Sequence, residues 1–194
     1  MAGGAPLTTR PHVSSQVAQV ASLIADASPL VALSLVDRLQ WLPEIFGPVH
    51  VVTTVLQEVL TGQFDASESS IRTALDKGWL MTTEPDRSSA TRIDLQQRPD
   101  WKLLDPGEAD SIAYAMAQTH HSKPPVLLMD ERAGRSVCAS LGLPVIGTAG
   151  LIVLAKERKL VTTAKPEFER LHEAGFWLAP QVVRMCLLRC GELA

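Results

Sequence analysis

Short apolar segments alternate with helical segments along this chain, and this alternation most restricts how it can fold. The clearest segment is 125–129, Pro-Val-Leu-Leu-Met, which is apolar throughout. Such a run is typical of a strand buried on both faces of a parallel sheet. We expect further strands at 21–25, 49–52, 79–82 and 145–146. Strands that alternate with helices predict an α/β protein with a central, mainly parallel sheet and helices on both faces.

Start and stop signals place the helices between these strands. Ser28-Pro29 and Asp105-Pro106 each put a capping side chain before a proline at the first helical position. Thr54 and Gln57 form a capping-box pattern. Helices are expected at 38–46, 66–77 and 148–159. Further helices should follow the caps at Ser28, Thr54 and Asp105, and another should follow Asp130. Two more are expected within 164–190. Residues 83–100, polar with two prolines, are expected to form a long surface loop.

The length of 194 residues suits one domain with an appendage. We expect residues 1–20 to form a flexible lead, 21–161 the α/β domain, and 162–194 a helical extension packed on it. No apolar run reaches the roughly 20 residues that span a bilayer, and the first 20 residues do not resemble a signal peptide. Three cysteines without metal-ligand spacing argue against disulfides or zinc. We therefore expect a soluble cytoplasmic protein without a membrane partner.

The charge balance excludes one class of nucleic-acid binder. A net charge of −3 and a pI near 5.9 argue against a broad basic face that neutralises many phosphates. An enzyme that contacts a few phosphates stays possible. The four tryptophans are scattered and lack interleaved basic residues, so the sequence does not predict a base-stacking platform.

Carboxylates follow the two strands expected at the centre of the sheet. Asp26 follows the first strand and Asp130 the most apolar one, and ligands of open α/β sheets bind at the carboxyl ends of strands. Glu58 lies at the margin of the apolar face of its helix. Asp110 flanks an apolar stripe, and it points away from Glu108 because residues two apart on a helix face nearly opposite directions.

Each acid also has an ordinary structural explanation. Asp26 and Asp130 suit turns or helix caps, Glu58 suits an exposed helix face, and Glu108 fits a capping box. Together, however, Asp26, Glu58, Asp110 and Asp130 would form an all-oxygen pocket. Such donors suit Mg²⁺ or Mn²⁺, which can activate water for phosphodiester cleavage.

The four acids, in this order, resemble the pattern of the PIN-domain family. The matching segments are Asp26-Ala-Ser-Pro-Leu, Val-Leu-Gln-Glu58-Val, Gly-Glu-Ala-Asp110-Ser-Ile-Ala and Leu-Leu-Met-Asp130-Glu-Arg-Ala-Gly-Arg. The later stretch Leu141-Gly-Leu-Pro-Val-Ile-Gly-Thr resembles one poorly characterised bacterial and archaeal subfamily. The resemblance covers about residues 21–161 and implies a three-layer α/β/α fold.

The resemblance also implies an activity, a cofactor and partners. It implies a Mg²⁺- or Mn²⁺-dependent endoribonuclease, and many bacterial relatives are VapC-like toxins that dimerise and are blocked by a small antitoxin. An RNA substrate, an antitoxin and a homodimer are thus expected partners. The implied metal ligands are Asp26, Glu58, Asp110 and Asp130, and the implied outer residues are Ser28, Glu108 and Glu131. Arg132 and Arg135 follow this site in sequence and are candidate phosphate contacts.

Two departures leave other functions open. Glu131 stands where many relatives have Asp, and the helices after residue 161 extend beyond a minimal toxin. A catalytically inactive PIN-fold module that docks a helix or a second copy is one alternative, favoured by the apolar stretch 182–188. A metal-dependent phosphatase that uses the same acids is another.

Overall fold

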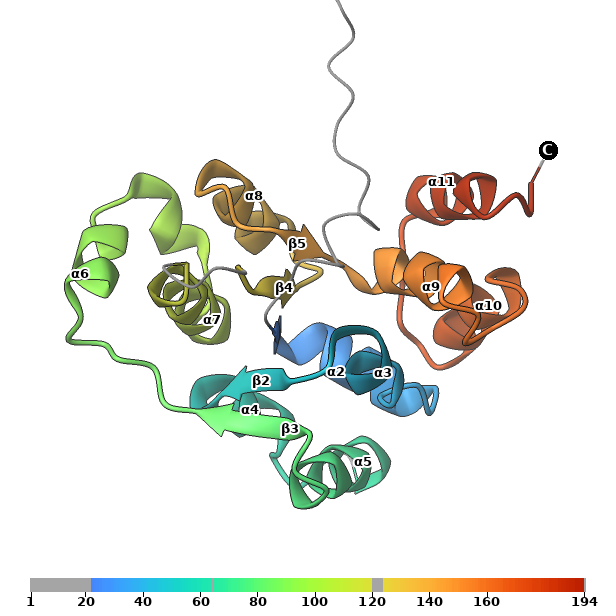
Figure 1. Cartoon of the computed structure of the whole chain (residues 1–194), viewed down its shortest axis with the longest axis horizontal. Coiled ribbons are helices and arrows are strands. Elements are labelled where there is room, and N and C mark those ends of the chain that lie inside the picture. The colour runs from blue at the N-terminus through green and yellow to red at the C-terminus, as the bar shows by residue number, and fades with distance from the viewer. Residues whose placement is uncertain (1–21, 64, 120–123, 194) are drawn as a thin grey trace, which may run out of the picture.

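The central sheet has five strands, all parallel. A computed structural model describes residues 22–63, 65–119 and 124–193 (Figure 1); the expected flexible lead, residues 1–20, lies outside them. The strands run in the order β3-β2-β1-β4-β5. Their bounds are β1 Leu23–Ala25, β2 Val49–Val52, β3 Leu80–Thr83, β4 Val126–Leu128 and β5 Val145–Ile146. The predicted parallel sheet is confirmed.

Helices cover both faces of the sheet and complete a three-layer α/β/α fold. They are α2 Ala27–Leu35, α3 Trp41–Phe46, α4 Thr53–Val59, α5 Asp65–Asp76, α6 Ala90–Gln96, the 3₁₀ helix η1 Pro99–Leu103, α7 Pro106–Ala117, α8 Arg132–Ser140, α9 Thr148–Glu157, α10 Lys165–Glu173 and α11 Pro180–Arg189. Figure 1 shows α6, α7 and α8 on one side of the sheet and α3, α5, α9 and α10 on the other. Among the described residues, no helix combines the length and apolar character that a membrane span requires.

Alternating strand side chains divide the core into two parts. Leu23 and Leu128 pack with α2, α3, α5, α9 and α10 on one face. Ile24 and Leu127 pack with α6, η1, α7 and α8 on the other. Since successive strand side chains point to opposite faces, short strands buried on both sides must be apolar at every position, as β4 is.

The segment predicted as a long loop, 83–100, contains a helix instead. Ser89 caps α6 by accepting a hydrogen bond from the backbone N–H of Arg92. Leu95 and Trp101 are buried in the core beside α7. The loop prediction was wrong because it rested on the polar composition of the segment. Burial of these two apolar side chains is enough to hold a short helical segment against the domain.

The helix starts were predicted with mixed success. The structure confirms the capping box at Asp105 and Glu108. The helix expected to begin at Pro29 with Ser28 as its cap begins two residues earlier, at Ala27, and Asp26 occupies the N-cap position. The box expected at Thr54 is absent, because α4 begins after Val52 with no side-chain cap and the Thr54 hydroxyl donates to Asp110 instead.

Candidate active site

The carboxyl edge of the sheet gathers acids from several elements. Asp26 directly follows β1, and Asp130 follows β4 after one further residue. Glu58 lies in α4, which follows β2 and contacts the start of α7. Asp105 and Glu108 form the cap of α7. This edge is where open parallel sheets bind ligands.

Asp26 is buried among other carboxylates. Its exposed fraction is 5%, and burial is the main reason that its pKa rises from 3.8 to about 7. The nearby charges of Asp105, Glu108 and Glu58 raise the pKa further, while the backbone N–H of Ala27 opposes the rise. These four residues, Asp26, Glu58, Asp105 and Glu108, are called the acidic cluster below.

Glu58 packs against the first turn of α7. A side-chain carbon on Gly107 would lie 2.8 Å from Glu58 Oε1, so a larger residue there would displace the carboxylate from this position. Burial raises the pKa of Glu58, as do the charges of Asp105 and Asp110, whereas the backbone N–H of Gly107 opposes the rise. A helix N-terminus is a favourable place for such an anion.

Glu108 serves the helix cap with one carboxylate oxygen only. Its Oε2 accepts from the backbone N–H of Asp105 at 3.2 Å, and its own backbone N–H donates to Asp105 Oδ1 at 2.7 Å. Its Oε1 is buried without a hydrogen-bond partner among the described residues. Burial raises the pKa of Glu108, and the charges of Asp105 and Glu131 add to this. This oxygen lies against Gly134 of α8, where a side-chain carbon would come within 2.5 Å of it, and the backbone of Gly134 opposes the rise in pKa.

Asp110 is engaged elsewhere. It is fully buried and accepts hydrogen bonds from the hydroxyl of Thr54 and from Arg87 Nη2, the latter at 2.8 Å. Arg92 Nη2 forms an ion pair with its other oxygen at 2.8 Å. Glu108 and Asp110 thus face different partners, as their spacing on a helix predicts. Asp110 is therefore paired with arginine, although its charge is near enough to raise the pKa of Glu58.

Asp130 is fixed by the start of α9 and lines a neighbouring pocket. Its two oxygens accept from the backbone N–H of Thr148, at 2.8 Å, and from the Thr148 hydroxyl. The pocket, about 520 Å³ in volume, is also lined by Ser28, Glu131 and Arg135. Arg135 Nη1 donates to the carbonyl oxygen of Met129 at 3.0 Å. The remaining predicted phosphate contact, Arg132, is exposed at the start of α8.

The donor chemistry of the acidic cluster suits a divalent cation. None of its four acids forms a salt bridge within the described part of the chain, whereas Asp110 pairs with two arginines. Uncompensated carboxylate oxygens, one of them buried without a partner, are typical ligands of Mg²⁺ or Mn²⁺. Across residues 22–63, 65–119 and 124–193, however, no three His, Cys, Asp or Glu side chains are arranged to hold a metal. Side-chain rotation would be needed to form a ligand shell.

Sequence reasoning missed several residues that shape this edge. Arg87 and Arg92 were hidden in the expected loop, although Ser89 offered a helix-capping signal there. Asp105 was recognised only as a cap, because sequence spacing cannot show which helix ends meet. Thr148 gave no signal at all, since its role depends on the neighbouring positions of β4 and β5.

Comparison with known proteins identifies the family. A family model described as a PIN domain matches residues 22–192, which includes α10 and α11. Searches among curated proteins and solved structures gave no match. The division at residue 161 stays a prediction. With the parallel sheet and its acidic carboxyl edge, the match shows that this chain belongs to the PIN-domain family.

Proposed function

We propose that this protein is a divalent-metal-dependent endoribonuclease that hydrolyses RNA phosphodiesters. PIN domains are generally nucleases. The observation that carries the proposal is the acidic cluster, in which the buried carboxylates of Asp26 and Glu108 lie near the exposed acids Glu58 and Asp105 and are repelled by them. None of the four is paired with a cation among the described residues. Burial and repulsion raise the pKa of Asp26 to about 7, so a bound cation would relieve a cost that the fold itself does not offset.

The residues proposed to hold Mg²⁺ or Mn²⁺ are Asp26, Glu58 and Glu108. The ion would lower the pKa of a bound water and offset the charge of the phosphate. We place Glu108 where Asp110 was expected, because Asp110 is paired with two arginines and accepts from Thr54, whereas Glu108 is paired with no cation in the described part of the chain. Asp105 completes the cap that orients Glu108.

The neighbouring pocket supplies the remaining roles. Thr148 holds Asp130 in one orientation, and we propose that Asp130 orients the attacking water by accepting its hydrogen bond. Arg135 keeps donors beyond the one that bonds Met129, and these would bind a phosphate oxygen. Ser28 and Glu131 would act as outer residues at the rim, and Arg132 as a second phosphate contact.

Cleavage of single-stranded RNA in Mn²⁺ or Mg²⁺ tests the proposal. Asp26→Asn, Glu58→Gln and Glu108→Gln should each lower the cleavage rate by about 100-fold or more, a magnitude typical of an essential acid or base. Glu173→Gln, an exposed acid of α10, is the control and should leave the rate unchanged. Circular dichroism should show that all variants are folded.

The comparison of Glu108→Gln with Asp110→Asn decides between the two acids. The proposal expects Glu108→Gln to abolish cleavage of a folded protein. It expects Asp110→Asn to act mainly on stability. A fully active Glu108→Gln together with a folded but inactive Asp110→Asn would restore the original assignment of Asp110.

A catalytically inactive binding module is the second candidate function. Trp177, Met185 and Leu188, in and just before α11, are 68%, 70% and 46% exposed, an apolar surface that an interaction partner could cover. A toxin role, a small antitoxin and a homodimer would use such a surface and stay proposals drawn from the family resemblance. Metal-independent partner binding without cleavage would favour this candidate.

A further inference from the structure

We propose that the pocket between the carboxyl edge of the sheet and α11 binds one unpaired nucleobase of the RNA, with Trp177 as the stacking residue. The inference rests on the proposed ribonuclease function and assigns its substrate recognition. It makes single-stranded RNA the preferred substrate, because a base in a duplex is already stacked and paired.

The two walls of this pocket differ in chemistry. Asp130, Glu131 and Ser28 line it from the carboxyl edge, beside the acidic cluster, whereas Trp177 and Val182 line it from the C-terminal segment. Its volume of about 520 Å³ falls in the range of roughly 300–1,000 Å³ usual for small-ligand sites. Groups suited to a phosphodiester and an apolar surface suited to a base thus share one cavity.

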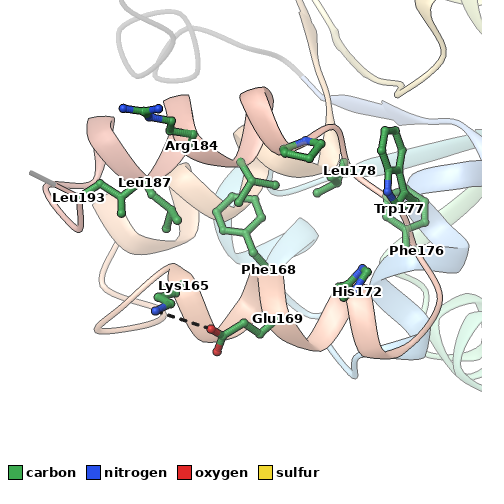
Figure 2. A pocket seen from close by; sticks show the side chains of 12 residues that line it. Lys165, Phe168, Glu169, His172, Phe176, Trp177, Leu178, Arg184, Leu187 and Leu193 are labelled. Carbon is green, nitrogen blue, oxygen red and sulfur yellow. Dashed lines mark ion pairs between the residues drawn. The ribbon is translucent and has the colours of Figure 1, made fainter.

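Trp177 is exposed although it is among the largest apolar side chains of the chain. Its exposed fraction is 68%, whereas Trp41 and Trp101 are each 7% exposed. Figure 2 shows it beside Phe176, where the chain passes from α10 to α11. A flat aromatic side chain at the mouth of a pocket that also holds charged groups is the usual arrangement for stacking a nucleobase.

Arg135 favours a nucleotide over an apolar peptide as the occupant. It lines the same pocket, and a nucleotide brings a phosphate for the guanidinium together with a base for the tryptophan. The second cavity of this region, between α10 and α11, is lined mainly by apolar residues such as Phe168, Val183 and Leu187 (Figure 2). Trp177, Phe176 and Leu178 line both cavities, but no residue of the carboxyl edge lines this second one, so we place the nucleobase in the first.

The sequence offered no sign of this site because the two walls lie far apart in the chain. Asp130 and Trp177 are brought to one pocket only by the packing of α11 beside α9. A stacking residue without basic neighbours in the sequence is invisible to a search for interleaved basic and aromatic residues.

Binding of a labelled single-stranded oligoribonucleotide to the full-length protein tests the inference. Fluorescence anisotropy in EDTA measures affinity without cleavage, and cleavage is then measured separately in Mn²⁺. Trp177→Ala should weaken binding by roughly 5- to 150-fold, the range reported for loss of one base–aromatic stack. Trp177→Phe, which keeps an aromatic face, should recover part of the affinity.

Met185→Ala is the matched control. Met185 lies in α11 with an exposed fraction of 70%, and it lines neither cavity. It should bind RNA as the unmodified protein does. Oligonucleotides with a single abasic residue at successive positions locate the base: one position should weaken binding to the unmodified protein and have no effect on Trp177→Ala.

The outcomes separate this inference from the ribonuclease proposal. If the protein cleaves RNA and Trp177→Ala binds and cleaves equally well, the stacking site is wrong and the ribonuclease proposal stands. Two other results also overturn the stacking site: an equal loss of RNA affinity in Trp177→Ala and Met185→Ala, or no abasic position that weakens binding. Either result would mean that α11 presents a general apolar surface, such as a protein partner would use. If the unmodified protein neither binds nor cleaves RNA, both proposals fail.

Discussion

At the residue scale, Asp26 carries the electrostatic cost of the site. It follows β1 directly, so its position is fixed by the central strand of the sheet. Its carboxyl is buried and its pKa is raised to about 7, first by burial and then by three neighbouring acids. In the absence of a bound cation, ionisation of Asp26 opposes folding.

This cost predicts how stability changes with pH. Because the folded-state pKa lies above the value of 3.8 for an ordinary aspartate, the folded protein holds the proton more tightly, and the free energy of unfolding falls as pH rises from about 4 to about 7. Asp26→Asn removes this loss. The free energy of unfolding is measured with urea, in EDTA, at pH 5 and at pH 8. Its fall between these two pH values should be smaller in Asp26→Asn by up to about 3 kcal/mol.

An exposed acid provides the control for that measurement. Asp76→Asn, near the end of α5, should keep the pH dependence of the unmodified protein. An equal pH dependence in Asp26→Asn and the unmodified protein would show that Asp26 ionises normally and would remove the basis for the acidic cluster.

At the element scale, α6 and η1 secure the helix that carries Glu108. Arg92 of α6 is buried, pairs with Asp110 of α7 and lies over the ring of Trp101 in η1, 5.2 Å from its centroid. Arg87 reaches the same carboxylate from the connection before α6, but its side chain is 63% exposed. The segment expected to be a loop therefore holds one side of the site in place.

The two arginines predict different costs on removal. Arg92→Met should lower the free energy of unfolding by about 3 kcal/mol, because a fully buried carboxylate loses its buried partner. Arg87→Met should cost clearly less, because the Arg87 side chain is largely exposed and solvent weakens its ion pair. Urea unfolding of both variants checks the difference, and an equal or larger loss in Arg87→Met would contradict this account of α6.

Glu192 helps to attach the C-terminal helices, together with the buried side chains of Phe168 and Leu187. Glu192 accepts from Lys156 Nζ and the backbone N–H of Ala164, each at 2.6 Å, and from the backbone N–H of Lys165 at 2.8 Å. Burial would raise the pKa of Glu192, but these hydrogen bonds outweigh it and lower the pKa. The contact links α9, the start of α10 and the end of the chain after α11.

Loss of that contact should loosen α11. Glu192→Ala should cost about 1.5–3 kcal/mol, the usual contribution of hydrogen bonds to a charged group, and should speed amide hydrogen exchange in α11 more than in β1. The matched variant Glu169→Ala, in an exposed pair with Lys165 on α10, should change neither. Unchanged exchange of α11 in Glu192→Ala would mean that apolar packing alone holds this helix.

At the scale of the whole molecule, the sequence determines the architecture more clearly than the site. The apolar strand at Val126–Leu128 and the cap at Asp105 depend on local patterns, so strands, helix order and parallel sheet could be predicted. Whether Glu108 or Asp110 acts with Asp26 and Glu58 depends on how α4, α6 and α7 pack. Contacts between helices far apart in the chain leave no local pattern in the sequence. Arg92, the buried arginine that pairs with Asp110, lies in a segment whose polar composition resembles that of a loop.

Charge also has a different meaning at this scale. The net charge of −3 argues against a broad RNA-binding face. Yet four acids lie in one cluster that a cation would offset, and Arg135 lines the adjoining pocket. Local placement rather than total charge therefore decides whether RNA can approach the site.

Calorimetric titration with Mn²⁺ at pH 7 tests the central claim most directly. We predict saturable binding that releases protons, because the raised pKa leaves Asp26 partly protonated at pH 7 and a metal ligand must be deprotonated. Titration in buffers of different ionisation enthalpy measures that release. Asp26→Asn and Glu108→Gln should lose the binding, whereas Glu173→Gln should keep it. No Mn²⁺ uptake by the unmodified protein, or equal uptake by all variants, would contradict the assignment of the acidic cluster as a metal-dependent reaction centre.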